Sequence, residues 1–431
     1  MMRILVLHAG GLGDLVLAET LFAALRERYP DGRLELACRS EVASVASLYA
    51  RPPDAVHPFP FNPYRWALPS GLVVAEIQAL AGLVGEGVDL LISAELRGTW
   101  LGETLAALLA PREAILPAPP GGRATYDLAV LLRRLGAPRH ADAQRVRAAG
   151  GEHELDRYAR LTGEGRRLPA LRPSPRAAAD PWLAVFPAGS PALKLWPHER
   201  MADAATQIAS RMPARIVLVG STAERGALAA AARAFPTPPE ILTADVEGLP
   251  GLAARLAGAQ GYLGIDSGLA HLAAAYGVPG VSIHSGATWP AYAPWRAGSA
   301  AVVAPIPCYG CELDCAFDRA FCIDGIDVAS VVAAFLRARD AASAAPFVVE
   351  VDAYSERERS IFAGAGRVHR ATQADRAARL VSITRVRDLL RRYAVRAGAR
   401  QHGSAVRLAR LASAAEQAAA LLARSKGGTR E

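Results

Sequence analysis

The chain has 431 residues, with a hydrophobic share of 52% and a charged share of 21%. This length predicts two or three domains, and this composition is ordinary for globular proteins, so it excludes wholesale disorder and fibrous architectures. The sequence has no apolar run of transmembrane length and starts with a short strand-like segment. We therefore expect neither a signal peptide nor a membrane span, and a cytoplasmic location.

The net charge of +8 is distributed unevenly along the chain. Residues 1–340 hold 32 Lys and Arg against 33 Asp and Glu, whereas residues 341–431 hold 17 against 8. A basic balance ordinarily indicates an anionic partner. Because the basic tail lacks interleaved aromatic residues and the body is neutral, we expect no nucleic-acid partner.

The first part of the chain alternates between strand and helix patterns. Apolar strand patterns cover residues 3–7, 34–38 and 88–93. A glycine-rich loop follows the first strand, and a helical apolar period then continues to residue 29. Strands that alternate with helices indicate parallel βαβ units, so we assign residues 1–165 to one α/β lobe.

A proline-rich stretch at residues 166–181 has the composition of a linker. After it the alternation restarts, with strand patterns at 182–186, 216–219 and 261–265 and helical patterns at 199–212 and 223–235. We therefore predict an α/β protein with a second lobe at residues 182–345. The ligand cleft is expected between the lobes, because open parallel sheets bind ligands at the ends of their strands.

The last segment, residues 346–431, has a different character. Helical apolar periods with arginines around the rest of the wheel cover residues 376–395 and 407–424, which predicts a basic helical extension. One alternative is contact with the anionic inner leaflet of the membrane, where each adjacent Lys or Arg contributes about 1 kcal/mol. The other is packing on the protein's own lobes or on a second subunit of a homo-oligomer.

The glycine loop leads into an acidic residue at the start of a helix. Gly10, Gly11 and Gly13 let the backbone approach a ligand closely, and the helix N-terminus attracts anions. Their spacing matches neither the dinucleotide fingerprint nor the phosphate loop. Asp14 is either an N-cap, worth about 1 kcal/mol, or a general base if it faces the cleft.

The loop after residues 182–186 carries a hydroxyl and an ammonium group. Ser190 offers a hydrogen-bond donor, and Lys194 offers a mobile positive charge that suits a phosphate. The alternative for Lys194 is the usual position of a lysine, solvated at the surface. These two residues are candidates for binding an anionic ligand.

The loop after residues 261–265 opens another helix. Asp266, Ser267 and Gly268 stand at the turn from strand to helix, where backbone N–H groups and the helix dipole favour an anion. His271 lies one turn further along the same face. A packed or solvated histidine is the alternative to a functional one at this position.

Four of the five cysteines lie within 15 residues, at Cys308, Cys311, Cys315 and Cys322. Four closely spaced thiolates can supply a tetrahedral metal site, and structural disulfides are rare in the cytoplasm. Mononuclear iron or zinc is the first expectation for this finger at residues 308–322, and an iron–sulfur cluster is the second. Packed reduced cysteines are the third alternative.

Taken together and in this order, the motifs resemble glycosyltransferase family 9, the bacterial ADP-heptose:lipopolysaccharide heptosyltransferases, over about residues 2–340. The resemblance is carried by Gly11-Leu12-Gly13-Asp14, by Gly189-Ser190 with Lys194-Leu195-Trp196-Pro197, by Val219-Gly220-Ser221-Thr222-Ala223-Glu224, and by Asp266-Ser267-Gly268 with His271. A cysteine-rich segment also recurs in the family, with an iron-binding version in autotransporter heptosyltransferases. His8 departs from the many members that carry Lys or Arg there.

The resemblance implies a GT-B fold of two Rossmann-like lobes, with the acceptor on the N-terminal lobe and the donor on the C-terminal lobe. It implies transfer of a heptosyl unit from an ADP-sugar to an acceptor hydroxyl, with inversion and with no divalent metal required. Asp14 matches the family's general base and Glu224 a ribose contact. The matches to the phosphate and sugar sites of the donor are Ser190, Lys194, Asp266, Ser267, Gly268 and His271.

Several alternatives stay open at this stage. The acceptor is a lipopolysaccharide core, another glycolipid or, as in the autotransporter enzymes, a protein. A second class of function is a non-catalytic scaffold that binds a nucleotide sugar and uses its cysteine finger and basic tail for assembly or membrane docking. A third is a GT-B epimerase for sugar nucleotides, or a transferase that uses a different nucleotide.

Overall fold

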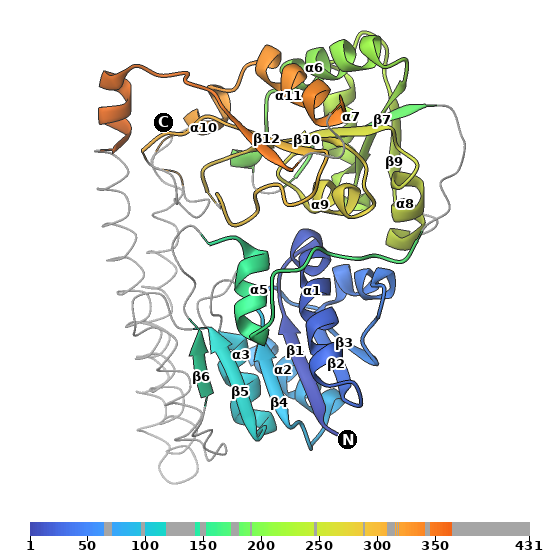
Figure 1. Cartoon of the computed structure of the whole chain (residues 1–431), viewed down its shortest axis with the longest axis vertical. Helices are drawn as coiled ribbons and strands as arrows, with labels where there is room; N and C mark the ends of the chain where they lie inside the picture. The colour runs from blue at the N-terminus through green and yellow to red at the C-terminus, as the bar shows by residue number, and fades with distance from the viewer. Residues whose placement is uncertain are drawn as a thin grey trace, which may run out of the picture.

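A computed structural model describes residues 1–63, 71–95, 100–117, 143–146, 152–173, 181–189, 192–244, 248–287, 289–307, 315, 317, 319–340 and 345–363 (Figure 1). Two α/β units follow one another along the long axis of the molecule, the first in blue to green and the second in green to orange. We refer to them as the N-terminal and C-terminal lobes.

The N-terminal lobe is built on a six-stranded parallel sheet with the order β3-β2-β1-β4-β5-β6. Its strands are β1 (Arg3–His8), β2 (Arg33–Arg39), β3 (Ala55–Phe59), β4 (Leu90–Ser93), β5 (Glu113–Pro117) and β6 (Ala143–Val146). Its helices are α1 (Leu12–Arg28), the 3-10 helix η1 (Ser40–Leu48), α2 (Gly71–Val84), α3 (Trp100–Leu109) and α5 (Glu154–Thr162). This strand order is that of the Rossmann fold.

The C-terminal lobe repeats this order and adds one strand, as β13-β12-β11-β10-β7-β8-β9. Its parallel strands are β7 (Trp182–Phe186), β8 (Arg215–Gly220), β9 (Glu240–Thr243), β10 (Gly261–Ile265), β11 (Gly280–His284), β12 (Ser299–Val303) and β13 (Phe347–Glu350). Its helices are η4 (Ala192–Lys194), α6 (His198–Arg211), η5 (Thr222–Glu224), α7 (Arg225–Ala232), α8 (Gly248–Leu256), α9 (Gly268–Ala275), α10 (Phe321–Asp324) and α11 (Val328–Asp340).

The central strands are buried on both faces, which explains why the sequence shows them as unbroken apolar runs. Every residue of β7 and β10 is buried, as is β1 from its second residue onward. Helices cover both faces of such a parallel sheet, so both side-chain rows become apolar. The predicted α/β fold with two parallel sheets is therefore confirmed.

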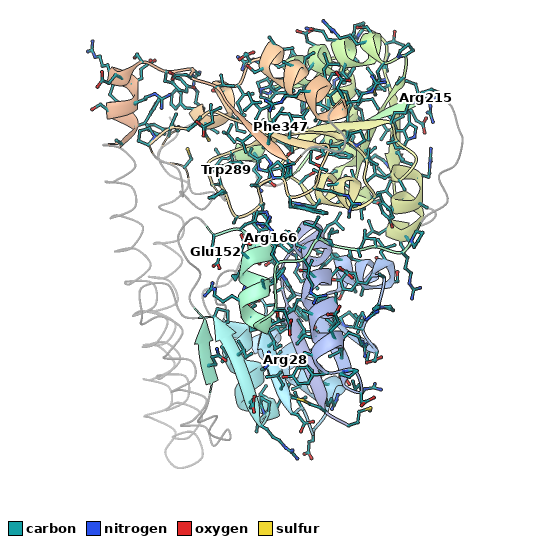
Figure 2. The ribbon with its side chains drawn as sticks, in the orientation of Figure 1. Arg28, Glu152, Arg166, Arg215, Trp289 and Phe347 are labelled. Carbon is teal, nitrogen blue, oxygen red and sulfur yellow. The ribbon has the colours of Figure 1, made fainter. Side chains whose placement is uncertain are left out.

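The segment that follows the C-terminal lobe begins with a strand. β13 pairs with β12 at the edge of the second sheet, and the Phe347 ring lies 4.1 Å from the Arg337 guanidinium (Figure 2). A helix follows at residues 356–363. The helices predicted at 376–395 and 407–424 lie outside the described residues and stay predictions. In the part of the chain that the structure covers, no helix is long and apolar enough to cross a membrane.

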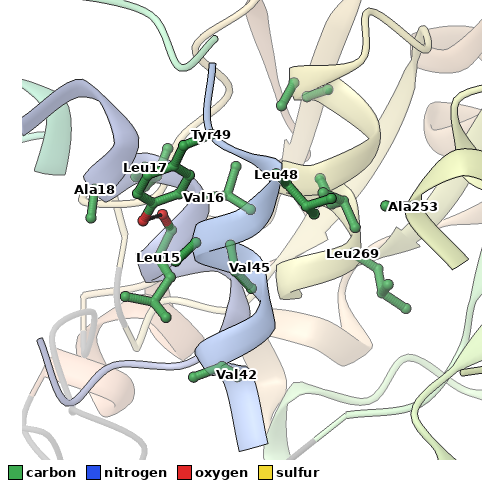
Figure 3. Close-up of a cluster of buried hydrophobic side chains, with 14 of the residues drawn as sticks. Leu15, Val16, Leu17, Ala18, Val42, Val45, Leu48, Tyr49, Ala253 and Leu269 are labelled. Carbon is green, nitrogen blue, oxygen red and sulfur yellow. Dashed lines mark hydrogen bonds between the residues drawn. The ribbon is translucent and has the colours of Figure 1, made fainter. Parts of the chain in front are cut away.

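One apolar core continues from lobe to lobe (Figure 3). Helix α1 packs against α9, and η1 packs against α8. Leu15 and Val45 from the N-terminal lobe belong to the same buried cluster as Ala253 and Leu269 from the C-terminal lobe. This shared core holds the carboxyl ends of both sheets against one another.

Candidate functional site

A cleft of about 800 Å³ lies between the two lobes. Its walls come from the segments that follow β1 and β2 in one lobe and β7, β8, β9, β10 and β11 in the other. In both sheets the order reverses beside the first strand, at β1 and at β7. Open α/β sheets bind ligands at this topological switch point. The cleft therefore joins the switch points of two sheets.

Asp14 lies at the N-terminal-lobe side of the cleft, with both carboxylate oxygens engaged. Oδ2 accepts the backbone N–H of Gly11 at 2.7 Å, which makes Asp14 a cap for the start of α1. Oδ1 accepts the phenol of Tyr292, a residue of the other lobe, at 2.5 Å. The two interpretations of Asp14, as a helix cap and as a general base, are thus compatible, since the cap orients a carboxylate that lines the cleft.

His8 holds the glycine loop through a hydrogen bond to its backbone. Its Nδ1 accepts the N–H of Gly10 at 3.1 Å, so the ring proton sits on Nε2 and is donated to the Tyr158 hydroxyl at 2.7 Å. Burial lowers the pKa of His8, which keeps the ring neutral. The residue that replaces the family's Lys or Arg therefore contributes a buried hydrogen bond to the loop and no positive charge.

Lys194 and Asp266 form an ion pair on the C-terminal-lobe side. The ammonium Nζ lies 3.0 Å from Asp266 Oδ2, and only 6% of the aspartate side chain is exposed. Burial alone would raise the pKa of Asp266, but the charge and hydrogen bond of Lys194, together with the nearby His284 and His271, more than offset this effect, so that pKa lies well below its ordinary value. Both residues line the cleft, and the ion pair places the lysine there as a fixed cation.

His271 is neutral, and its tautomer is set by a tryptophan. Burial lowers the pKa of His271 to about 4. Its Nδ1 accepts the indole N–H of Trp295 at 3.1 Å, so the remaining ring proton is on Nε2, 4.0 Å from Asp266 Oδ1. The site thus holds an uncharged imidazole N–H donor beside the Lys194–Asp266 pair.

The start of α9 meets the start of α1 at two glycines. A Cβ on Gly268 would lie 2.7 Å from the Gly13 nitrogen, and one on Gly13 would lie 2.8 Å from His271 Cδ2. No side chain fits in this contact, so two helix N-termini converge on the same cleft. The Ser267 hydroxyl next to them is buried and has no hydrogen-bond partner among the residues that the structure describes. Free N–H groups and this hydroxyl suit an anionic ligand.

Glu224 lines the cleft at the end of β8 and caps the short helix η5. Its Oε2 accepts the N–H and the hydroxyl of Ser221 at 2.8 and 2.7 Å. Both contacts hold the Glu224 carboxylate through Oε2. Beside it, Ala244, Leu249 and Leu252 give the cleft an apolar wall.

Most predicted site residues come together in this cleft. Those that line it are Gly11, Gly13, Asp14, Lys194, Glu224, Asp266, Ser267, Gly268 and His271. Gly10 lies behind them, where a Cβ would meet the Asp14 side chain at 2.5 Å. Ser190 lies outside the described residues. Its role in binding phosphate therefore stays a prediction.

The cysteine finger is only partly described, because Cys308 and Cys311 lie outside the described residues. The Cys322 thiol is buried, and its Sγ accepts the Gly286 N–H at 3.5 Å, whereas the Cys315 thiol donates to the Arg319 carbonyl at 3.7 Å. Within the described ranges no group of three or more His, Cys, Asp and Glu side chains could hold a metal. The iron or zinc site stays a prediction that needs the other two thiols.

The sequence patterns do not predict the aromatic residues of the site. Tyr292 and Trp295, which contact Asp14 and His271, lie between β11 and β12 in a segment with no regular period. One signal was present: Trp289, Tyr292 and Trp295 fall within seven positions of a chain that is 6% aromatic. His284, 3.9 Å from Asp266 through its Nδ1, was missed as well.

Comparisons with known proteins bear on the family and the fold. Residues 141–316 match the family model of glycosyltransferase family 9 (heptosyltransferase). No match was found among curated proteins. A solved glycosyl transferase of family 9 from Veillonella parvula DSM 2008 is 16% identical with a TM-score of 0.61, over 78% of this chain and 97% of its own.

Two heptosyltransferases of E. coli have a similar fold. ADP-heptose lps heptosyltransferase II is 17% identical with a TM-score of 0.59, over 80% of this chain and 100% of its own. Heptosyltransferase WaaC with ADP-2-deoxy-2-fluoro heptose is 21% identical with a TM-score of 0.53, over 70% and 94%. The GT-B fold and the resemblance to family 9 are confirmed.

Proposed function

The chain is a glycosyltransferase with a family 9 domain, and from this premise we propose that it transfers a heptosyl or related sugar from an ADP-sugar to an acceptor hydroxyl with inversion. The observation that carries the proposal is the cleft itself, where one carboxylate faces a set of anion-binding groups. The acceptor is proposed to be a glycolipid of the lipopolysaccharide core or a related glycoconjugate.

In this proposal the C-terminal lobe binds the donor. The Lys194 ammonium, the first N–H groups of α9 and the Ser267 hydroxyl interact with the diphosphate. Negative charge builds up on this diphosphate as the glycosidic bond breaks, and fixed donors in a water-poor cleft stabilise it. Because these groups supply positive potential of their own, we propose that no divalent metal is required.

Asp14 is proposed to be the general base. Glycosyl transfer requires removal of a proton from the acceptor hydroxyl as it attacks the anomeric carbon. Of the carboxylates that line the cleft, Asp266 is paired with Lys194, Glu41 is paired with Arg39, and Glu224 caps η5. Asp14, in contrast, faces both lobes at the meeting point of two helix N-termini. Inversion follows from one direct displacement, with Asp14 on the side of the ring opposite the leaving ADP.

A neutral His271 fits this mechanism better than a cationic one. With a pKa of about 4, His271 stays uncharged at neutral pH and donates through Nε2. Such a donor interacts with a sugar hydroxyl or a phosphate oxygen without offsetting the charge of Asp14. A neutral imidazole also leaves Lys194 as the cation of this part of the cleft.

The proposal is tested by incubating purified protein with ADP-, UDP- and GDP-linked sugars and following binding by thermal shift and transfer by mass spectrometry. We expect ADP and ADP-heptose to raise the melting temperature most, and transfer to require an ADP-heptose. Stabilisation by UDP or GDP instead of ADP would contradict the choice of nucleotide. Binding of ADP-heptose without transfer to any glycolipid or protein acceptor would favour a non-catalytic scaffold.

A further inference from the structure

Three consecutive residues of the loop between β11 and β12 reach across to the N-terminal lobe. The Ala291 carbonyl accepts the Glu154 N–H at 2.9 Å, and the Ala293 carbonyl accepts a hydrogen bond from His153 Nε2 at 3.0 Å. Between them, the Tyr292 hydroxyl donates to Asp14 Oδ1. We call this set of contacts the interlobe clasp. Figure 2 labels Trp289, which belongs to this loop, and Glu152, which precedes α5.

The N-terminal-lobe half of the clasp is a rigid platform. His153 is the N-cap of α5, and its Nδ1 accepts the Leu155 N–H at 3.0 Å, which leaves the Nε2 proton for the other lobe. The Glu154 carboxylate pairs with the buried Arg157, whose guanidinium also donates to the Ala94 carbonyl at the end of β4. The loop therefore docks on a helix start that is fixed to the sheet.

Tyr292 lies between the two chemical halves of the site. Its ring packs edge-on against the His271 ring with centroids 6.0 Å apart, while its hydroxyl contacts Asp14. Burial and the Asp14 charge raise the pKa of Tyr292 well above its ordinary value. The phenol is therefore protonated at all physiological pH values, and its only role toward a carboxylate is that of donor.

We propose that Tyr292 is a positioning residue that fixes the Asp14 carboxylate when the two lobes are closed. The Gly11 N–H holds one carboxylate oxygen from within the N-terminal lobe, and the Tyr292 phenol holds the other from the opposite lobe. A carboxylate oxygen has a second acceptor site, so Oδ1 can still accept the acceptor hydroxyl. Opening of the lobes withdraws the phenol and leaves the carboxylate held by a single bond.

This inference rests on the proposed function, and it explains how transfer is limited to the closed enzyme. An open glycosyltransferase with a fully oriented base would activate water beside the donor. Orientation of the base by a residue from the donor lobe makes the base dependent on closure, which also excludes water from the cleft.

The test compares Tyr292→Phe with wild type in two measurements. Hydrogen exchange is measured without substrate on peptides that contain Gly11 and Glu154, and transfer is measured with an ADP-sugar. We expect faster exchange in both peptides, a fall in kcat of about 10- to 100-fold, and a donor KM within 3-fold of wild type. In an Asp14→Asn background, Tyr292→Phe is expected to cause no further loss of kcat.

Two variants separate positioning from general destabilisation. His153→Asn keeps a side chain that caps α5 but is too short to reach Ala293, and we expect the same changes to a smaller extent. Tyr276→Phe removes a hydroxyl from a tyrosine of the same lobe outside the cleft lining, and wild-type exchange and kcat are expected.

The outcomes separate this inference from the proposed function. Unchanged exchange together with a kcat of Tyr292→Phe within 2-fold of wild type would overturn the positioning role. Faster exchange in Tyr292→Phe, in a protein whose wild type transfers no sugar from any ADP-linked donor, would support the coupling of Tyr292 to Asp14 and contradict the proposed function.

Discussion

The two lobes share one strand order but present opposite chemistry to the cleft. The loop after β1 supplies a carboxylate, Asp14, whereas the loops after β7 and β10 supply an ammonium, an imidazole N–H and a helix N-terminus. Since β7 holds the place in its sheet that β1 holds in the other, Lys194 and Asp14 follow equivalent strands, and the difference lies in the segments after them. The scaffold places a site, and a few loop residues decide whether that site moves a proton or binds an anion.

The comparison also explains why neither lobe is sufficient. Gly13 and Gly268 touch through their backbones, and Asp14 receives a hydrogen bond from the opposite lobe. Asp14 and the groups that we propose to bind the donor are thus brought into one cleft by contacts between the lobes. Each variant below changes a residue of one lobe or a contact between the two lobes.

The largest expected effect on stability comes from breaking the ion pair of the C-terminal lobe. Lys194→Ala removes the ammonium that pairs with the buried Asp266 carboxylate, which we expect to lower the free energy of unfolding by about 3 kcal/mol and to weaken ADP binding at least 10-fold. The double variant Lys194→Ala/Asp266→Asn is expected to recover most of the stability but not the ADP affinity. Chemical denaturation and calorimetry measure both; equal ADP affinity in all three proteins would show that Lys194 does not bind the diphosphate.

The next effect comes from the glycine contact between the lobes. A Cβ on Gly268 would lie 2.6 Å from the Leu12 Cβ, so Gly268→Ala must push α1 and α9 apart. We expect kcat/KM for transfer to fall about 10- to 100-fold and small-angle scattering to show a larger radius of gyration. Gly226→Ala in α7 is the control, because its Cβ meets nothing within 4 Å, and a small gain in stability is expected. Wild-type transfer by Gly268→Ala would contradict a closed active form.

Acid is expected to destabilise the folded protein between pH 6.5 and 4. Burial lowers the pKa of His271 to about 4, against about 6.5 when unfolded, so in this range the unfolded chain binds a proton that the folded chain does not. The free energy of unfolding then falls as pH falls, by about 2 kcal/mol at pH 5 from His271 alone. Denaturation at pH 7.5 and pH 5 measures this change.

The same comparison for His271→Gln provides the control. This variant is expected to show a smaller loss on acidification, while the remaining loss comes from His8, His153 and His284, whose pKa values burial also lowers. Equal stability of the wild type at both pH values would contradict a lowered pKa of His271 in the folded state.

The smallest expected effect comes from Trp295→Phe, which keeps the ring packing but removes the indole N–H. His271 Nδ1 then loses its donor, and the ring is free to take the other tautomer. We expect a loss of about 1 kcal/mol of stability and a 3- to 10-fold lower kcat, with little change in ADP affinity. Nitrogen chemical shifts of His271 report the tautomer, and an unchanged Nε2–H form in the variant would show that Trp295 does not set it.

The sequence predicted the strand ends well because each buried strand is a short apolar run followed by glycine or polar residues. Asp14, Lys194 and Asp266 were found for this reason, since each follows such a strand. The sequence did not predict the contacts between these residues and the opposite lobe. Tyr292 and Asp14 are 278 residues apart in the chain, and the loop that carries Tyr292 has no period from which its direction could be inferred.

The domain boundaries show the same limit. The change in composition predicts that the second lobe ends at residue 345. β13 lies just beyond this residue and pairs with β12. An edge strand of four residues is recognisable only by its partner, and a composition window does not contain the partner. The tendency of Asp14 to cap a helix was visible in the sequence, but its second hydrogen bond depended on the closure of the lobes.

We propose that Asp14 moves a proton and that the opposite lobe binds the donor. It is tested most directly by measuring single-turnover transfer from ADP-heptose and the Kd for ADP in Asp14→Asn beside wild type. Asparagine retains the size of the side chain but is a poor base, so we predict a loss of at least about 1000-fold in the transfer rate with an ADP Kd within 3-fold of wild type. Transfer at the wild-type rate by Asp14→Asn would contradict the account.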